Sequence, residues 1–296
     1  MFKNIFIFKI IQASMAGIED FLTPAAFVPA GATQEQSVGW VPPRGQDHGA
    51  LYETVAGHGF MKLMIETKSV PGEAIARALE EQVKKIEQST GRKPGKKERR
   101  ELKDEIRLSL LPMAFSKRSA CLMWINHQDG YIVIEASSQG KADTAVTQLV
   151  KSLDGLGIQL VNTKTSPVAA MAHWLMEKEA PEDFSIDREC ELKASDESKA
   201  VVKYGRHPLD IEEVAQHIRA GKMPTKLALT WNDRVSFVLT EGLQVKKLAI
   251  LDVVFEESAS KSDTAADNFD ADMAITTGEL SKMIPALIAA LGGEVV

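Results

Sequence analysis

The residues best suited to bind a ligand lie in one short stretch. Six of the nine residues from 92 to 100 are basic and a single one, Glu98, is acidic; the bases are Arg92, Lys93, Lys96, Lys97, Arg99 and Arg100. Like charges this close repel one another unless an anion balances them, and a nucleic-acid backbone is such an anion. Solvated helices also carry many charges, and Lys97 and Glu101 have the i,i+4 spacing of an ordinary surface pair. The stretch alone therefore predicts either a nucleic-acid contact or a merely basic surface.

Other chemistries find less support among the residues. The segment 91–97 looks like a phosphate loop, but three residues instead of four separate its glycines and no Ser or Thr follows its lysine. The acidic segment 263–272 lacks the central glycine of a calcium-binding loop. The six histidines are scattered without an HExxH pattern, and no Gly-x-Ser-x-Gly elbow occurs. We expect no catalytic residue, metal or cofactor, although Asp270 and Asp272 leave a metal-dependent DNA-processing enzyme as an alternative.

Charge is distributed unevenly along the 296 residues. The chain as a whole carries −6, which by itself argues against a polyanionic partner. However, residues 84–118 hold twelve bases against five acids, a net charge of +7. From residue 250 onward two bases stand against nine acids, a net charge of −7. Phosphate binding needs one basic face, so this polarity says more than the total.

A helical hairpin is predicted to present the basic stretch. Pro71 is suited to the first helical position, and apolar residues recur every three to four positions from Ile75 to Ile86. A Gly- and Pro-containing turn leads to a second helix over 96–111, which Pro112 ends. The bases of residues 92–100 therefore lie at the tip of the hairpin and at the start of its second helix.

The rest of the chain predicts an α+β fold of antiparallel sheets with packed helices. The run after Lys3 loosely resembles a secretory signal, but Lys9 interrupts it, so we favour a buried first strand. We expect a Gly- and Pro-rich loop that ends with residues 39–45. Further along the chain we expect a strand over 243–254, an acidic loop over 263–270 and a strand over 271–276. The acidic segment 177–187 is the best domain boundary. It divides a central domain (1–71 and 119–176), from which the hairpin (72–118) protrudes, from a second domain (177–296).

The two cysteines give no sign of a redox or metal site. Cys121 and Cys190 lack CxxC spacing and are predicted to be free thiols in a reducing cytosol.

Phe115 follows the proline that ends the hairpin. Its type predicts either a core residue or an anchor for a second subunit, since large aromatic side chains dominate both environments.

Ten short segments, in order over nearly the whole chain, carry a further signal. Those in the first half are MFKN at 1–4, GWVPP at 39–43, LKDE at 102–105, SLLPMAFS at 109–116 and MWI at 123–125. Those in the second half are AGK at 220–222, TKLAL at 225–229, FDAD at 269–272, TGEL at 277–280 and AALGGE at 289–294. Together they resemble the RdgC family of bacterial recombination-associated proteins.

The resemblance implies a horseshoe-like subunit and a homodimer that closes into a ring around duplex DNA. It implies binding with little sequence preference, restraint of RecA-driven strand exchange through the shared DNA, and a cytoplasmic, nucleoid-associated location. A module that contacts RecA without DNA is the second alternative. The family aromatic at one dimer contact falls on Phe115, which favours an interface over a core position.

The resemblance also extends the expected DNA-binding set to the second domain. A lysine and a glutamine of the family fall on Arg206, which keeps the charge, and on His207, which departs from the pattern. With the neighbouring bases, the residues expected to contact DNA are Arg92, Lys93, Lys96, Lys97, Arg99, Arg100, Lys117, Arg118, Lys203, Arg206, His207, Lys222 and Lys226.

Overall fold

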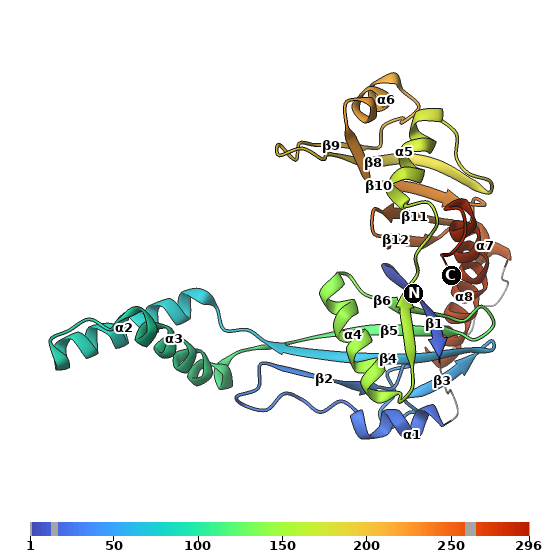
Figure 1. Cartoon of the computed structure of the whole chain (residues 1–296). Helices are drawn as coiled ribbons and strands as arrows, with labels where there is room; N and C mark the ends of the chain where they lie inside the picture. The colour runs from blue at the N-terminus through green and yellow to red at the C-terminus, as the bar shows by residue number, and fades with distance from the viewer. Residues whose placement is uncertain (1, 13–16, 258–264, 296) are drawn as a thin grey trace.

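The computed structural model describes residues 2–12, 17–257 and 265–295 (Figure 1). All described strands join one antiparallel sheet of 12 strands, in the order β2-β4-β5-β6-β1-β12-β11-β10-β8-β9, with β3 beside β4 and β7 beside β1. The strands are β1 (Ile5–Gln12), β2 (Gln36–Val41), β3 (Tyr52–Val55), β4 (His58–Lys68), β5 (Ser116–Asn126), β6 (Tyr131–Glu135), β7 (Gly157–Leu160), β8 (Phe184–Ala194), β9 (Val201–Gly205), β10 (Lys222–Trp231), β11 (Val235–Thr240) and β12 (Val245–Ile250). The α+β class is confirmed, with a single sheet in place of several.

The described helices lie around and beyond this sheet. They are α1 (Ile18–Leu22), α2 (Gly72–Thr90), α3 (Lys96–Leu110), α4 (Gln139–Ser152), α5 (Pro167–Glu177), α6 (Glu212–Arg219), α7 (Asp252–Glu257) and α8 (Ala265–Ala290), with short 3₁₀ turns at Thr23–Ala25 and Leu111–Met113. None of them is long and apolar enough to cross a membrane.

Strand β1 joins the two halves of the sheet and explains the apolar start of the chain. Ile5 and Ile7 enter one hydrophobic cluster, while Phe6 and Phe8 enter another on the opposite face. A strand buried on both faces needs a continuous apolar run instead of an alternating one. The predicted first strand is therefore confirmed, while residues 13–16, the small-residue stretch that completes the signal-like pattern, lie outside the described part.

One face of the second half of the sheet packs against helices. Cys190 and Leu192 of β8 are buried in the same hydrophobic cluster as Val214 of α6 and Leu280 of α8. Because side chains alternate along a strand, Glu189 and Glu191 point to the opposite face. The sheet is continuous between the halves, with Ile5 opposite Val245, so the boundary placed at 177–187 stays an interpretation.

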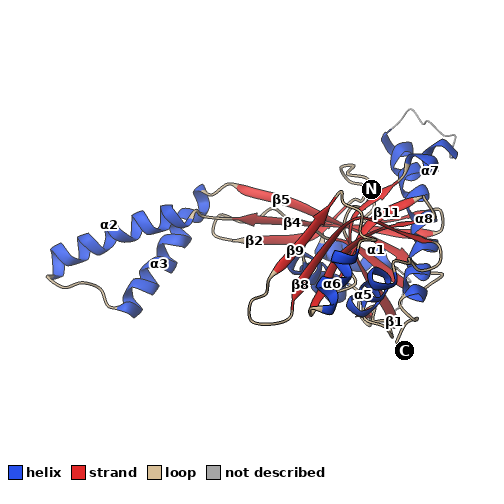
Figure 2. Ribbon diagram, turned by 90° about the horizontal axis from the view of Figure 1, so that it is seen from above, coloured by secondary structure: helices blue, strands red, loops and turns tan. Residues whose placement is uncertain are grey.

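The predicted helical hairpin is present as α2 and α3. It projects from the ends of β4 and β5 and extends away from the rest of the molecule in both views (Figures 1 and 2). Gly91 ends α2 with φ of 71°, a left-handed value that glycine adopts without strain, and Gly95 precedes α3. We call the two helices and their turn, residues 72–110, the arm.

Three predictions about local structure are wrong. Gly39, Trp40 and Val41 belong to β2 instead of a loop. The segment 271–276, with the described part of 263–270, belongs to α8 instead of a strand and a loop. The strand predicted over 243–254 ends earlier, at Ile250, and α7 follows it. Figures 1 and 2 place α7 and α8 on the side of the molecule away from the arm.

Gly39 lets the backbone of β2 approach the segment after α1 closely. A Cβ atom at this position would lie 2.4 Å from the Cα of Phe27 and 2.7 Å from its nitrogen. The amide of Phe27 donates to the carbonyl of Trp40 at 2.9 Å, so the two segments cannot separate without losing this bond. A glycine is therefore required where the sequence alone suggests a loop.

We expect Gly39→Ala to lower the free energy of unfolding by about 1–3 kcal/mol, the usual cost of overpacking. Gly140 in the first turn of α4 is the matched control, since a Cβ there meets no atom within 4 Å and its φ is not positive. Gly140→Ala should be neutral or stabilising by up to ~1 kcal/mol. Urea unfolding of both variants measures the difference, and equal stabilities would contradict the close approach.

Candidate nucleic-acid interface

The arm carries the six bases that the sequence placed at its tip. Three of them make loose ion pairs: Arg92 with Glu98 at 3.1 Å, Lys93 with Glu87 at 3.7 Å, and Lys97 with Glu101 at 3.9 Å. Such pairs between exposed side chains contribute little energy, so a phosphate can replace the carboxylate as the partner of each base.

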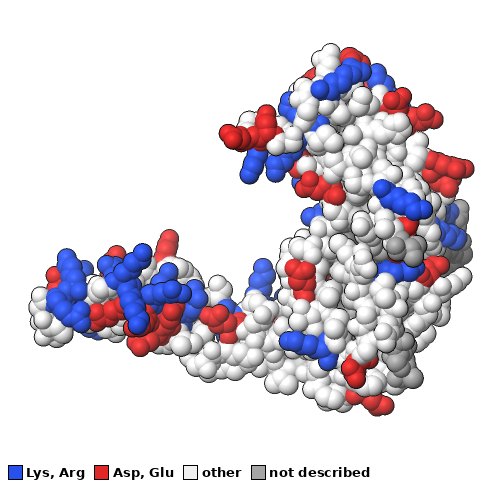
Figure 3. Space-filling model, viewed as in Figure 1, with Lys and Arg blue, Asp and Glu red and all other residues white. Residues whose placement is uncertain are grey.

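The other three bases of the arm tip have no such partner in the part of the chain that the structure describes. Lys96, Arg99 and Arg100 are exposed and make no ion pair with a described residue; Arg100 and Asp104 have the i,i+4 spacing of a surface pair but do not form one. Figure 3 shows Lys and Arg gathered along the arm with acidic side chains between them. The arm therefore presents an excess of positive charge to solvent, far from the body of the molecule.

Lys117 and Arg118 lie at the base of the arm, in the first residues of β5. Arg118 serves partly to hold this base together, because its Nε lies 3.3 Å from the carboxylate of Glu66 and its guanidinium stacks over Phe27. The amide of Ala30 also donates to Glu66, at 2.9 Å, and this hydrogen bond lowers the pKa of Glu66, helped by Arg118. The side chain of Arg118 is still 53% exposed, which leaves it able to face a ligand.

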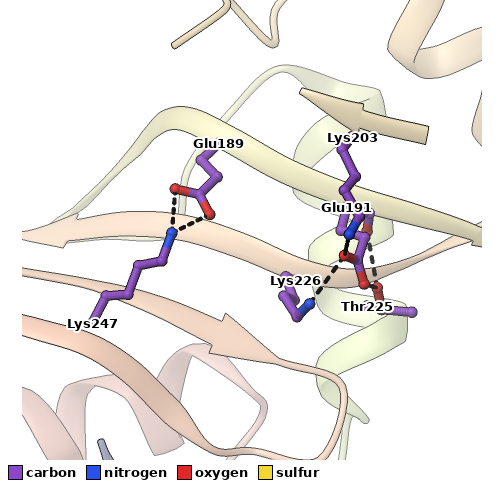
Figure 4. A network of polar contacts seen from close by, with 6 residues as sticks. All are labelled: Glu189, Glu191, Lys203, Thr225, Lys226 and Lys247. Atoms are coloured by element: carbon purple, nitrogen blue, oxygen red, sulfur yellow. Dashed lines mark hydrogen bonds and ion pairs between the residues drawn. The ribbon is translucent and has the colours of Figure 1, made fainter. Parts of the chain in front are cut away.

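Lys203 and Lys226 come together on the second half of the sheet. They lie on β9 and β10, on either side of Glu191 of β8, and their ammonium groups are 3.1 and 3.0 Å from the same carboxylate oxygen (Figure 4). Burial by itself would raise the pKa of Glu191, but hydrogen bonds from Lys226, Thr225 and Lys203 outweigh it and lower the pKa to about 2. One carboxylate is thus shared by two lysines, and the cluster remains positive.

This shared carboxylate has a consequence for acid stability. A group with a folded-state pKa of about 2, below its ordinary value of 4.5, stabilises the fold above pH 4.5, and this contribution is lost as the pH falls through 2. We expect the stability difference between the native protein and Glu191→Gln to be larger at pH 7 than at pH 3. Urea unfolding at both pH values measures it, with Glu197→Gln in the exposed loop after β8 as control. An equal difference at the two pH values would contradict the pairing.

Arg206, His207 and Lys222 lie further along the same half of the chain. Arg206 is exposed just beyond β9, with φ of 56°. The Nδ1 of His207 is 2.8 Å from the carbonyl oxygen of Pro208, so it acts as the donor and carries the proton. Lys222 donates to Nδ1 of His217 at 3.1 Å. The expected DNA contacts therefore form two groups, one on the arm and its base and one on β9, β10 and the turn after β9.

Phe115 does not belong to the core of the single chain. It is 95% exposed, and Met113 and Leu108 near it are 72% and 51% exposed. An apolar surface of this kind at the base of the arm is typical of a protein contact. The structure thus removes the core alternative and leaves an interface as the prediction for Phe115.

The two acids of the enzyme alternative do not face one another. Asp270 pairs with Arg44 at 2.6 Å, whereas Asp272 is exposed. Both lie on α8, and residues two apart on a helix point in different directions. Within residues 2–12, 17–257 and 265–295, no three His, Cys, Asp or Glu side chains are placed to hold a metal ion. Cys121 and Cys190 are free, as predicted, and both are buried.

The sequence missed four residues beside Lys203 and Lys226. Glu189 and Glu191 on β8, and Lys246 and Lys247 on β12, line the same groove. The sequence does not indicate that side chains of β8 and β12 come together, because β10 and β11 lie between these two strands in the sheet. The adjacent Lys246 and Lys247 are the one local sign of a basic surface at this place.

These features define the class of protein: an α+β protein with a continuous antiparallel sheet and a protruding basic helical arm. Comparison with known proteins gives the family. The sequence model described as "Putative exonuclease, RdgC" matches residues 1–294. The chain belongs to the RdgC family, as its ten segments indicated.

Curated relatives agree over the full length. The chain is 40% identical to the recombination-associated protein RdgC of Dechloromonas aromatica, with all of this chain and 98% of the relative covered. It is 44% identical to that of Cupriavidus necator over 94% of this chain and 92% of the relative. It is 38% identical to that of Bordetella pertussis over 99% and 98%. These relatives place the chain in a recombination context.

Proposed function

We propose that the chain binds the backbone of duplex DNA with little sequence preference, as a homodimer that closes into a ring around the duplex. The observation that carries the proposal is the exposed basic arm, which extends far from the body and holds Lys96, Arg99 and Arg100 with no ion-pair partner among the described residues. Lys and Arg contacts to phosphates release counterions and carry no sequence information directly.

In this proposal the ring has a basic inner surface and an acidic outer one. The arm and the lysines of β9 and β10 contact DNA, while the acidic α7 and α8 lie on the side away from the arm (Figures 1 and 2). Phe115 closes one contact between the two horseshoe-like subunits. A ring on the nucleoid in the cytoplasm would restrain RecA by occupying the duplex, without direct contact with RecA.

Titration of two unrelated duplexes of equal length against salt tests the binding. The proposal expects dissociation constants within a few-fold of each other, and a logarithm of affinity that falls linearly with the logarithm of salt concentration. A flat salt dependence, or a strong preference for one duplex, would contradict it. Binding to RecA with no binding to DNA at low salt would favour a protein-only module.

A second candidate is nuclease activity, which the description of the matching family suggests. Incubating labelled duplex with the protein and Mg²⁺ or Mn²⁺ separates the two functions. The binding proposal expects intact DNA under conditions in which a complex forms. Cleavage that Asp270→Asn and Asp272→Asn remove together would establish the enzyme instead.

A further inference from the structure

The open face of the second half of the sheet carries a groove. Tyr204 of β9 is buried on the helical face, where its hydroxyl donates to Glu213 of α6 at 3.1 Å. Its neighbour Lys203 therefore points to the other face, together with Glu191 and Lys226, which lie opposite one another in the register. The groove on this face has a volume of about 380 Å³ and includes Lys246 and Lys247 in its lining.

An ion pair spans this groove. Lys247 of β12 places its ammonium group 2.5 and 2.8 Å from the two carboxylate oxygens of Glu189 on β8 (Figure 4). Three strand spacings separate β12 from β8, roughly 14 Å in a flat sheet, so the ion pair reaches across β11 and β10. The register shifts between Ser236 and Val238, where β11 meets β12, and such bulges bend a strand.

The backbone of Lys247 is held in an unfavourable conformation at this bulge. Its φ is 51°, in the left-handed region that residues with a side chain seldom adopt. Asn4 accepts a hydrogen bond from the amide of Lys247 at 3.4 Å, and the carbonyl of Lys3 accepts one from Leu248 at 2.9 Å. The start of the chain thus fixes the bulge, which directs the ammonium group of Lys247 across the groove.

The groove has more positive than negative charge. Lys203, Lys226, Lys246 and Lys247 face two carboxylates, Glu189 and Glu191, and Lys246 makes no ion pair with any residue that the structure describes. Lys247 and Glu189 are 64% and 42% exposed, so their pair is open to solvent and exchangeable. Glu191 holds its two lysines more firmly, at 17% exposure.

We propose that this groove is a phosphate site of the DNA-binding surface, in which Glu189 and Glu191 act as internal counter-anions. A backbone phosphate takes the place of a carboxylate as the partner of Lys247, Lys203 or Lys226. The inference rests on the proposed function and adds to it Lys247 as a contact and the two glutamates as residues that reduce affinity. Each displaced carboxylate takes up a cation, which cancels part of the counterion release that drives binding.

Variants of the full-length protein test the proposal against the same duplex. Glu189→Gln should bind about tenfold more tightly at 0.1 M salt, and its logarithmic salt slope should steepen by up to ~0.9. Glu191→Gln should act in the same direction. Lys247→Gln should bind about tenfold more weakly, with a shallower slope. Since Glu189 and Lys247 are exposed, their variants report on binding even if Glu191→Gln fails to fold.

Glu212→Gln is the matched control, because it also removes a carboxylate from an exposed ion pair, that of Arg219 on α6. Its affinity should equal that of the native protein. If Glu189→Gln and Lys247→Gln bind like this control while the native protein binds duplex, the inference is wrong and the proposed function stands. Failure of the native protein to bind duplex at any salt concentration would overturn the proposed function itself.

Discussion

Replacing Lys96 and Arg100 by glutamine is expected to weaken duplex binding about 100-fold at 0.1 M salt, since each phosphate contact contributes ~0.9 to the logarithmic salt slope. The two residues are one helical turn apart on α3, so they share a face. Both are exposed and neither makes an ion pair with a described residue, so the substitution removes charge without breaking a contact within the protein.

Fluorescence anisotropy over a range of salt concentrations measures this effect, together with the thermal midpoint as a test of folding. The double variant Lys164→Gln, Lys282→Gln is the control. Both lysines are exposed and lie outside the arm, and their replacement removes the same total charge as the arm variant. The control pair should change the affinity only slightly. An arm variant that binds like the control would show that the basic arm is an ordinary solvated surface.

Phe115→Ser is expected to weaken one subunit contact and to speed the release of the protein from DNA. Burial of a phenylalanine in an interface is worth about 1.5–3 kcal/mol, which corresponds to roughly 10- to 150-fold in the dissociation constant of that contact. Folding should be unaffected, because Phe115 is 95% exposed in the single chain and surface substitutions change stability by about 0.5 kcal/mol at most.

Val253→Ser provides the comparison for this variant. Val253 is also an exposed apolar residue, at 40%, but it lies on α7, on the side away from the arm (Figure 1). Sedimentation velocity measures assembly, and competition with unlabelled duplex measures release. Release of the Phe115 variant at the native rate, with unchanged assembly, would remove Phe115 from the interface.

The arm could be predicted from the sequence because its signals are local. Pro71, the apolar recurrence from Ile75 and the glycines around the turn each act within a few residues of one another, and the structure places α2 and α3 within one or two residues of the prediction. The exposed bases follow directly, since a two-helix arm with a single apolar stripe must present its other faces to solvent.

Helix α8 could not be predicted because packing overrides its local preferences. Ile275, Thr276 and Thr277 are β-branched and favour a strand. In the structure Thr276 and Thr277 are almost fully buried, and Thr277 donates its hydroxyl to the carbonyl of Met273 at 2.7 Å, four residues earlier. This bond satisfies the buried hydroxyl within the helix, and the apolar residues that follow hold α8 against the sheet.

The groove on the second half of the sheet could not be predicted from the sequence for a different reason. Lys203 and Lys226 were expected to contact DNA, but their shared partner Glu191 depends on the register of β8 with β9 and β10. Lys247 lies beside a bulge in the pairing of β12 with β11, and no residue type marks this bulge in advance. Register and curvature come from contacts between distant segments, which a single sequence does not display.

Retention on closed circular DNA, compared with the same plasmid after linearisation, tests encirclement most directly. The protein is bound at low salt and then washed at a salt concentration that breaks phosphate contacts. A closed ring can leave linear DNA over its ends but cannot leave a covalently closed circle, so the account predicts retention on the circle and loss from the linear form. Equal loss from both forms would contradict a ring around the duplex.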